Sequence, residues 1–279
     1  MCSRIFFKKL HYLVVSNKAG LTAFSAKVFV DCTGDAGIIS QCGLAFEYEY
    51  RTRPEMHHTR KDCQVYDIVR SDKYPLVTDE HSCNSLIGPR TVGFNAGHLW
   101  NVHATDPLNV SRALIEGRRL AHQFHQGLKE FYPEAFAASF LSATAPAMGI
   151  RESRRIVGEY ELTLQDYMER RTFEDEKEHV NRGELNTDTR YENYGPGESY
   201  GIPYRSLIPK GTKNLLVAGQ TICRERIVQG SVRVMPTCLV TRQGAGTVAA
   251  MAALHDVDTG NLDVNKLRDK LLADGAYLK

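Results

Sequence analysis

VFVDCTGD (Val28–Asp35) is a short apolar run that stops abruptly at a glycine, and NLLVAGQ (Asn214–Gln220) repeats this pattern far along the 279-residue chain. Such runs predict buried strands, over Ala26–Asp31 and Asn214–Ala218. The glycine after each strand permits a tight turn or the close approach of a ligand. Strands that end in this way present backbone to nucleotides, although any α/β sheet can contain them. The two runs therefore predict an α/β fold and leave a nucleotide site open.

Residue periodicity and turn residues predict the elements around these strands. Asn17–Gly20 is a turn between two β-rich runs, which predicts a hairpin over 11–24. Thr163 is a plausible helix start, and Thr91–His103 resembles a strand. A short strand is expected between Gly201 and Pro209, whereas 47–90 is polar without a clean period and 172–199 is expected to be exposed. Helices are predicted over Gly37–Gly43, Asn109–Phe131, Phe136–Ala147, Met235–Leu254 and Gly260–Lys279.

GSVRVMPTC (Gly230–Cys238) leads directly into a helix of small residues, with Pro236 suited to its first turn. A helix start carries unpaired N–H groups and a partial positive charge. Aimed at a flavin ring, these groups would stabilise the negative charge that builds up on reduction. A core helix that packs its small face closely against a sheet would have the same sequence, so both interpretations stay open.

Other motifs are weaker or absent. Gly244–Ala249 spells GxGxxA, but it lies inside a predicted helix rather than directly after a strand, so we reject it as a dinucleotide fingerprint. The sequence contains no GxGxxG, GxSxG, HExxH or Walker motif. GIRESRR (Gly149–Arg155) holds three arginines, which could bind a substrate carboxylate. On charge alone, an ion-paired surface is the better explanation of that cluster.

Composition narrows the class of protein. Hydrophobic residues make up 42% and charged residues 24%, which supports a packed core. The net charge of +2 gives no electrostatic reason to expect nucleic acid, and no apolar run is long enough to span a bilayer. Seven dispersed cysteines without a CxxC pair argue against disulfides and favour a cytoplasmic location. We expect no metal, because the spacing of these residues matches no zinc pattern: His57, His58, Cys63, His81 and Cys83.

Five segments together resemble one family. They are VDCTGDAGI, GHLWN, GIRESRRIVGEYELT, YGIPYRSLIPKGTKNLLVAGQ and GSVRVMPTC. In this order they are similar to the FAD-dependent oxidoreductases of the FAD_oxidored type, over about Asn17–Leu254. That family is distantly related to the succinate dehydrogenase and fumarate reductase flavoproteins, within the glutathione-reductase-like superfamily.

The resemblance implies a partial Rossmann-like FAD-binding domain (1–45 and 200–279), interrupted by an α+β substrate or cap domain (46–199). It implies hydride transfer between flavin and a small organic substrate, such as a carboxylate or a sugar-like compound. Arg151 and Arg154 are the implied catalytic residues. The implied cofactor-binding residues are Thr33, Gly34, Asp35, Gly219, Ser231, Arg233, Val234, Met235 and Cys238.

The sequence departs from the family pattern at three places. The glycine-rich N-terminal unit that cradles the FAD diphosphate is not found, so we expect an incomplete chain that binds FAD weakly or not at all. Arg242 begins the segment RQGAG, where the family has Gly-Gln-Ala-Ala-Gly. Arg226 stands near where the family often has histidine. The alternative hypothesis is a non-catalytic, truncated relative that acts as an interaction or scaffold module.

Overall fold

The computed structural model describes residues 8–42, 44–48, 65–79, 82–180 and 194–278. The chain forms two compact units, which we describe separately. Unit 1 comprises residues 1–49 and 151–279, and unit 2 comprises residues 50–150. The described residues 151–180 and 194–199 belong to unit 1. The mixture of helices and small sheets agrees with the α/β class.

A parallel pair of short strands lies at the centre of unit 1. Strand β3 (Phe29–Asp31) pairs with β10 (Leu215–Val217), as the two apolar runs predicted. Because side chains alternate between the faces of a strand, β10 contributes to two cores. Leu215 and Val217 belong to one core together with Ile39, and Leu216 belongs to the other together with Val248. All three side chains of β10 are fully buried.

The turn after β3 is organised by the carboxylate of Asp31, which is completely buried. It accepts hydrogen bonds from the Thr33 backbone N–H at 2.9 Å and hydroxyl at 2.6 Å, and from the Ile38 N–H at 3.0 Å. The Thr33 hydroxyl in turn accepts from the Gly37 N–H at 2.9 Å, at the start of helix α1 (Gly37–Gln41). The aspartate therefore ends the strand and positions the following helix.

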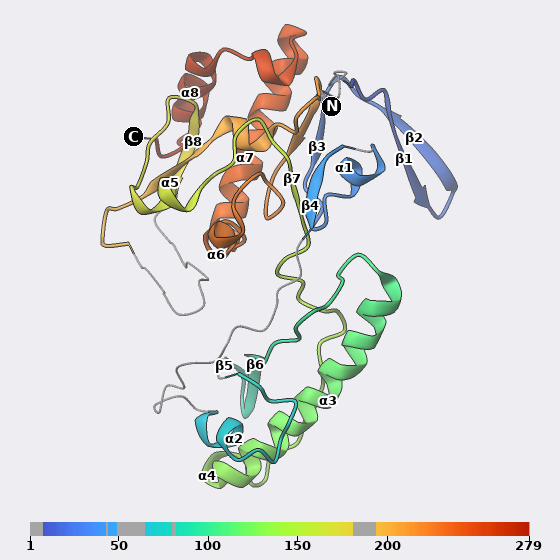
Figure 1. Ribbon diagram of the computed structural model, residues 1–279, viewed down its shortest axis with the longest axis vertical. Helices are drawn as coiled ribbons and strands as arrows, with labels where there is room; N and C mark the ends of the chain where they lie inside the picture. Colours follow the sequence, from blue (N-terminus) through green and yellow to red (C-terminus); the bar gives the residue numbers. More distant parts are fainter. Residues whose placement is uncertain (1–7, 43, 49–64, 80–81, 181–193, 279) are drawn as a thin grey trace, which may run out of the picture. The chain divides into compact units, whose positions relative to one another are not determined.

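Helix α7 (Met235–His255) covers β10 with its small residues and confirms the predicted helix. Pro236 lies in its first turn, where its missing N–H costs no helical hydrogen bond. Helix α8 (Val264–Ala273) contributes Leu267 and Leu271 to the same core as Val248. Figure 1 shows α7 and α8 in orange and red on one side of unit 1.

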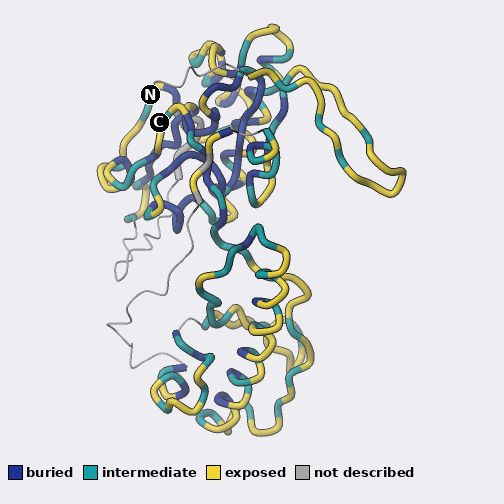
Figure 2. Tube along the Cα trace, turned by 45° about the vertical axis from the view of Figure 1, so that its right-hand side comes forward, coloured by how far each residue is buried: buried dark blue, intermediate teal, exposed yellow. Residues whose placement is uncertain are grey.

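The remaining elements of unit 1 surround this centre. Strand β1 (Tyr12–Asn17) and β2 (Gly20–Ser25) form the predicted hairpin, which projects from the unit with mostly exposed side chains (Figure 2). The other pairs are β4 (Phe46–Tyr48) with β7 (Arg154–Ile156) and β8 (Glu176–Val180) with β9 (Tyr200–Pro203). The short helices are α5 (Leu164–Met168), α6 (Gln229–Val232), η1 (Tyr204–Leu207), η2 (Arg226–Val228) and η3 (Thr259–Asn261).

Unit 2 is built on the long amphipathic helix α3 (Pro107–Phe131). The Asp106 carboxylate caps this helix by accepting from the Leu108 and Asn109 N–H groups. Leu120, Phe124 and Leu128 of α3 pack in one core with Ile68. The other elements are α2 (Tyr66–Arg70), the hairpin of β5 (Ser82–Gly88) and β6 (Thr91–Ala96), and α4 (Pro133–Phe136).

Several predicted elements differ from those in the structure. The helix predicted over Phe136–Ala147 is wrong, because α4 ends at Phe136. The Ser139 hydroxyl donates to the Phe136 carbonyl at 2.7 Å, which competes with helical bonding, and Pro146 disfavours helix before it. The segment 172–199 contains strand β8, with 181–193 outside the described residues. The short strand expected between the segments Gly201–Pro203 and Ser206–Pro209 lies earlier, in β9, and the 3-10 helix η1 stands in its place.

Leu216→Ala tests whether β10 is central to stability. The side chain is fully buried, so its removal should lower the free energy of unfolding by about 2–5 kcal/mol. The matched control is Leu21→Ala on the hairpin, where the side chain is 79% exposed and the expected change is within about 0.5 kcal/mol. Urea denaturation followed by circular dichroism measures both, and equal effects would contradict this account of the core.

Candidate functional site

The Gly34 carbonyl joins three segments that are far apart in the sequence. It accepts hydrogen bonds from the Gln220 side-chain amide at 2.8 Å and from the Ser153 hydroxyl at 3.2 Å. Gly34 follows β3, Gln220 follows β10, and Ser153 precedes β7. The two strand-end turns and the arginine-rich segment therefore meet at the carboxyl end of the parallel pair.

The arginine-rich segment makes two more contacts with this region. Arg154 donates from Nη1 to the Asp35 carbonyl at 3.3 Å. The Arg151 carbonyl accepts from the Gln229 side-chain amide at 2.7 Å, which links the segment to α6. Arg151 and Arg154 are half-buried, whereas the buried Arg155 forms an ion pair with Glu47. Ion pairing therefore accounts for Arg155, and Arg151 and Arg154 border the turns and α6.

The residues predicted around the start of α7 divide into two groups. The Ser231 and Tyr200 hydroxyls share a 2.6 Å hydrogen bond inside the core, where burial raises the pKa of Tyr200. The Cys238 thiol is also buried and donates at 3.5 Å to backbone carbonyls of the preceding turn. By contrast, Val234 is only half-buried and Met235 is 82% exposed. The backbone at the helix start is therefore accessible, and Ser231 and Cys238 support it from beneath.

The helix start and its surroundings carry polar groups suited to a ligand. No side chain caps α7 at its N-cap residue, Val234, within the described residues. Three buried side-chain oxygens also lack a hydrogen-bond partner within that part of the chain: Thr221 Oγ1, Gln229 Oε1 and Thr237 Oγ1. An unpaired buried oxygen is unfavourable by roughly 1–3 kcal/mol. A polar ligand could meet this need, so these residues fit a cofactor that bears many hydrogen-bonding groups.

The turn after β10 places a cation beside a thiol. Gly219 adopts φ +91°, a conformation that favours glycine, and its N–H donates to Thr241 Oγ1 at 3.0 Å. The guanidinium of Arg242 lies against Gly219. Desolvation raises the pKa of the exposed Cys32 thiol above its usual value, and the nearby Arg242 guanidinium opposes this shift.

The structure brings together part of the predicted site. A hydrogen bond connects Arg154 directly with Asp35, and Ser153, the neighbour of Arg154, is bonded to Gly34. Arg151 reaches the same region through Gln229. The Thr33 hydroxyl is used within its own turn. Sequence reasoning missed three connecting residues: Ser153, Gln220 and Gln229. Two of them lie inside recognised segments, but their roles depend on partners that spacing does not reveal.

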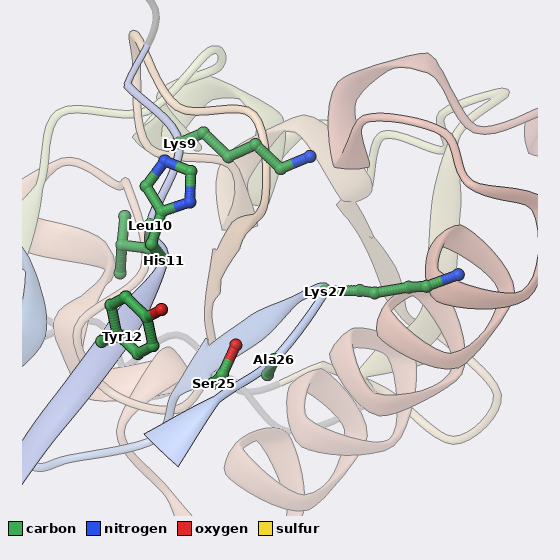
Figure 3. Close-up of a pocket in the computed structure, with 7 residues that line it drawn as sticks. All are labelled: Lys9, Leu10, His11, Tyr12, Ser25, Ala26 and Lys27. Carbon is green, nitrogen blue, oxygen red and sulfur yellow. The ribbon is translucent and has the colours of Figure 1, made fainter. Parts of the chain in front are cut away.

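A separate hollow of about 400 Å³ lies at the base of the β1–β2 hairpin. Figure 3 shows its lining, which includes Lys9, His11 and Lys27. The Lys27 ammonium donates to the Ala253 carbonyl at 3.0 Å. None of the predicted site residues lines this hollow, so we assign it no role.

The described residues contain neither a metal-binding cluster nor a helix that could cross a membrane. They contain no cluster of three or more histidine, cysteine, aspartate or glutamate side chains that could hold a metal ion. Of the five histidines and cysteines whose spacing was compared with zinc patterns, only Cys83 is described, since His57, His58, Cys63 and His81 lie outside that part of the chain. No helix within the described ranges has the length and apolar character needed to cross a membrane.

Residues 49–271, well over half of the chain, match the family model described as "FAD dependent oxidoreductase". No curated protein and no solved structure gives a significant match. The matched segment includes the arginine-rich segment, the turn after β10 and the start of α7. The Thr33–Asp35 turn precedes it.

The thiol of Cys32 gives a test of the electrostatics of this region. Arg242→Gln removes the neighbouring charge that lowers its pKa, so the pKa should rise further and less thiolate should exist at pH 8. Alkylation of Cys32 by iodoacetamide should therefore slow at pH 8, and the midpoint of its pH–rate profile should move upward. Peptide mass spectrometry measures this rate.

The control within the same samples is Cys83, an exposed thiol on β5 of unit 2. Its alkylation rate should be the same in both proteins. An unchanged midpoint for Cys32 would show that the guanidinium does not act on this thiol.

Proposed function

The chain belongs to the FAD dependent oxidoreductase family, and from this premise we propose that unit 1 binds FAD at the carboxyl ends of β3 and β10. Ligands of open α/β sheets bind outside the carboxyl ends of parallel strands. The observation that carries the proposal is the pair of hydrogen bonds to the Gly34 carbonyl, which assembles two strand ends and the arginine-rich segment. We infer that this pair, covered by α7, belongs to a Rossmann-like FAD-binding domain, with unit 2 as the substrate domain.

The residues that would hold FAD are of two kinds. Gly34 and Gly219 have no side chain, so the backbone of the strand-end turns can approach a ligand closely, and the guanidinium of Arg242 borders this approach at Gly219. The start of α7 offers uncapped N–H groups together with Val234 and Met235. Thr237 and Gln229 each carry a buried oxygen without a described partner. Both hydrogen-bonding groups and open backbone are therefore available to a dinucleotide.

When bound, FAD supplies the hydride chemistry by exchanging a hydride with an organic substrate. The protein's part is binding and electrostatics. The N–H groups at the start of α7 stabilise negative charge nearby. Because these groups are already fixed in position, they need no reorganisation when charge develops. Arg151 and Arg154 would bind and orient an anionic substrate. A guanidinium carries five donors, and the bond to the Asp35 carbonyl uses Nη1 of Arg154. The substrate class we propose is a small carboxylate.

FAD binding is tested with a matched pair of glycine variants. Gly219 and Gly20 both have positive φ, so alanine strains either by about 1–2 kcal/mol. An alanine Cβ at Gly219 would also come within 3.3 Å of Arg242, whereas nothing lies within 4 Å at Gly20. Gly219→Ala should weaken FAD binding at least tenfold, and Gly20→Ala should leave it unchanged. Quenching of FAD fluorescence during titration measures the dissociation constant.

The proposal fails if the unsubstituted protein shows no saturable FAD binding, which would favour a non-catalytic interaction module. Equal effects of the two glycine substitutions would place FAD away from β10. Thermal unfolding of each variant, followed by circular dichroism, separates a loss of binding from a loss of folding.

A further inference from the structure

We propose that Arg242 of this chain forms an ion pair with the diphosphate of FAD; this role rests on the proposed function. The packing of α7 against β10 determines the position of Arg242. Thr241, which is 1% exposed, accepts the hydrogen bond of the Gly219 N–H. This bond fixes the second turn of the helix against the end of the strand. Arg242, the next residue, consequently lies at the carboxyl edge of the parallel pair.

The guanidinium of Arg242 lies beside Gly219. From the position that a Cβ would take on Gly219, the distances are 3.3 Å to Nη2, 3.7 Å to Cζ and 3.7 Å to Nε. The guanidinium therefore occupies the space next to this glycine. Arg242 is nevertheless exposed to solvent. One side of the guanidinium is therefore supported by backbone, and the residue still reaches the surface where a ligand of the strand ends would arrive.

The charge of Arg242 is uncompensated within the described part of the chain. Four other arginines of unit 1 form ion pairs with carboxylates: Arg155, Arg170, Arg171 and Arg205. No described carboxylate lies within ion-pairing distance of Arg242. Its titratable neighbours are instead the thiols of Cys32 and Cys238; burial raises the pKa values of both thiols, and the Arg242 guanidinium only partly opposes this rise. A supported, unpaired guanidinium is well suited to an anion.

Chemistry identifies which anion. A planar guanidinium binds phosphate oxygens in two-point geometry, and each such charge-assisted bond is stronger than a neutral one. FAD carries its negative charge on a diphosphate, and the adjoining turn has glycine where the backbone must approach a ligand. The substrate carboxylate is assigned to Arg151 and Arg154, which contact the other side of the site at Asp35 and Gln229. The position that is glycine in the resembled family thus carries a phosphate contact here.

The test compares FAD with riboflavin, which has the same ring and no phosphate. Arg242→Gln should weaken FAD binding by roughly 10- to 100-fold and leave riboflavin binding unchanged. Arg242→Lys should retain part of the lost affinity. The control is Arg119→Gln, which removes an equally exposed charge from α3 of unit 2 and should alter neither ligand. Fluorescence titration measures all dissociation constants, and circular dichroism confirms folding.

A second readout does not depend on the variants. FAD should protect Cys32 from alkylation in the unsubstituted protein, because this thiol interacts with the Arg242 guanidinium, whereas riboflavin should protect it less. The inference is overturned if Arg242→Gln binds FAD as tightly as the unsubstituted protein or more tightly. It is equally overturned if Arg242→Gln weakens the binding of FAD and of riboflavin to the same extent. Absence of FAD binding by the unsubstituted protein would instead defeat the proposed function itself.

Discussion

The parallel pairing of β3 with β10 is the constraint on which unit 1 depends. It brings together two segments that lie far apart in the sequence, and the buried side chains of β10 contribute to the cores on both faces. Everything assigned to the site is attached to its carboxyl end. The Asp31 carboxylate shapes one turn, Gly219 shapes the other, and Gln220 connects them through the Gly34 carbonyl. Without this pairing, the glycines of the two strand-end turns and the arginines of the arginine-rich segment would not lie close together.

The sequence predicted those elements whose signals are local. An apolar run followed by glycine identified β3 and β10, and small residues after Pro236 identified α7. Thr163 marked the start of α5 because it forms a capping box with Asp166, which needs only neighbouring residues. Helical spacing of apolar residues found α3. In each case the physical cause lies within a few residues of the element it produces.

Other features depend on distant partners and could not be predicted in this way. Strands β4 and β7 have three residues each and exist through their mutual pairing. The connecting roles of Ser153, Gln220 and Gln229 require acceptors more than 70 residues away, as their separations of 119, 186 and 78 show. The Phe136–Ala147 helix failed for the opposite reason. Its composition favours helix, but the Ser139 hydroxyl bonds to the nearby Phe136 carbonyl. The side chain of Phe140 is 81% exposed, so burial of this side chain does not stabilise a helix there.

The β1–β2 hairpin has a practical consequence for handling the protein. Near the base of the hairpin, the side chains of Leu10 and Leu13 pack against a core. Close to the tip, the side chain of Leu21 is largely exposed. The Lys18–Ala19 turn therefore lies outside the packed interior and carries none of the residues assigned to the cofactor. Surface turns of this kind tolerate inserted sequence. A peptide epitope or a reporter dye attached there would label unit 1 and leave the strand ends undisturbed.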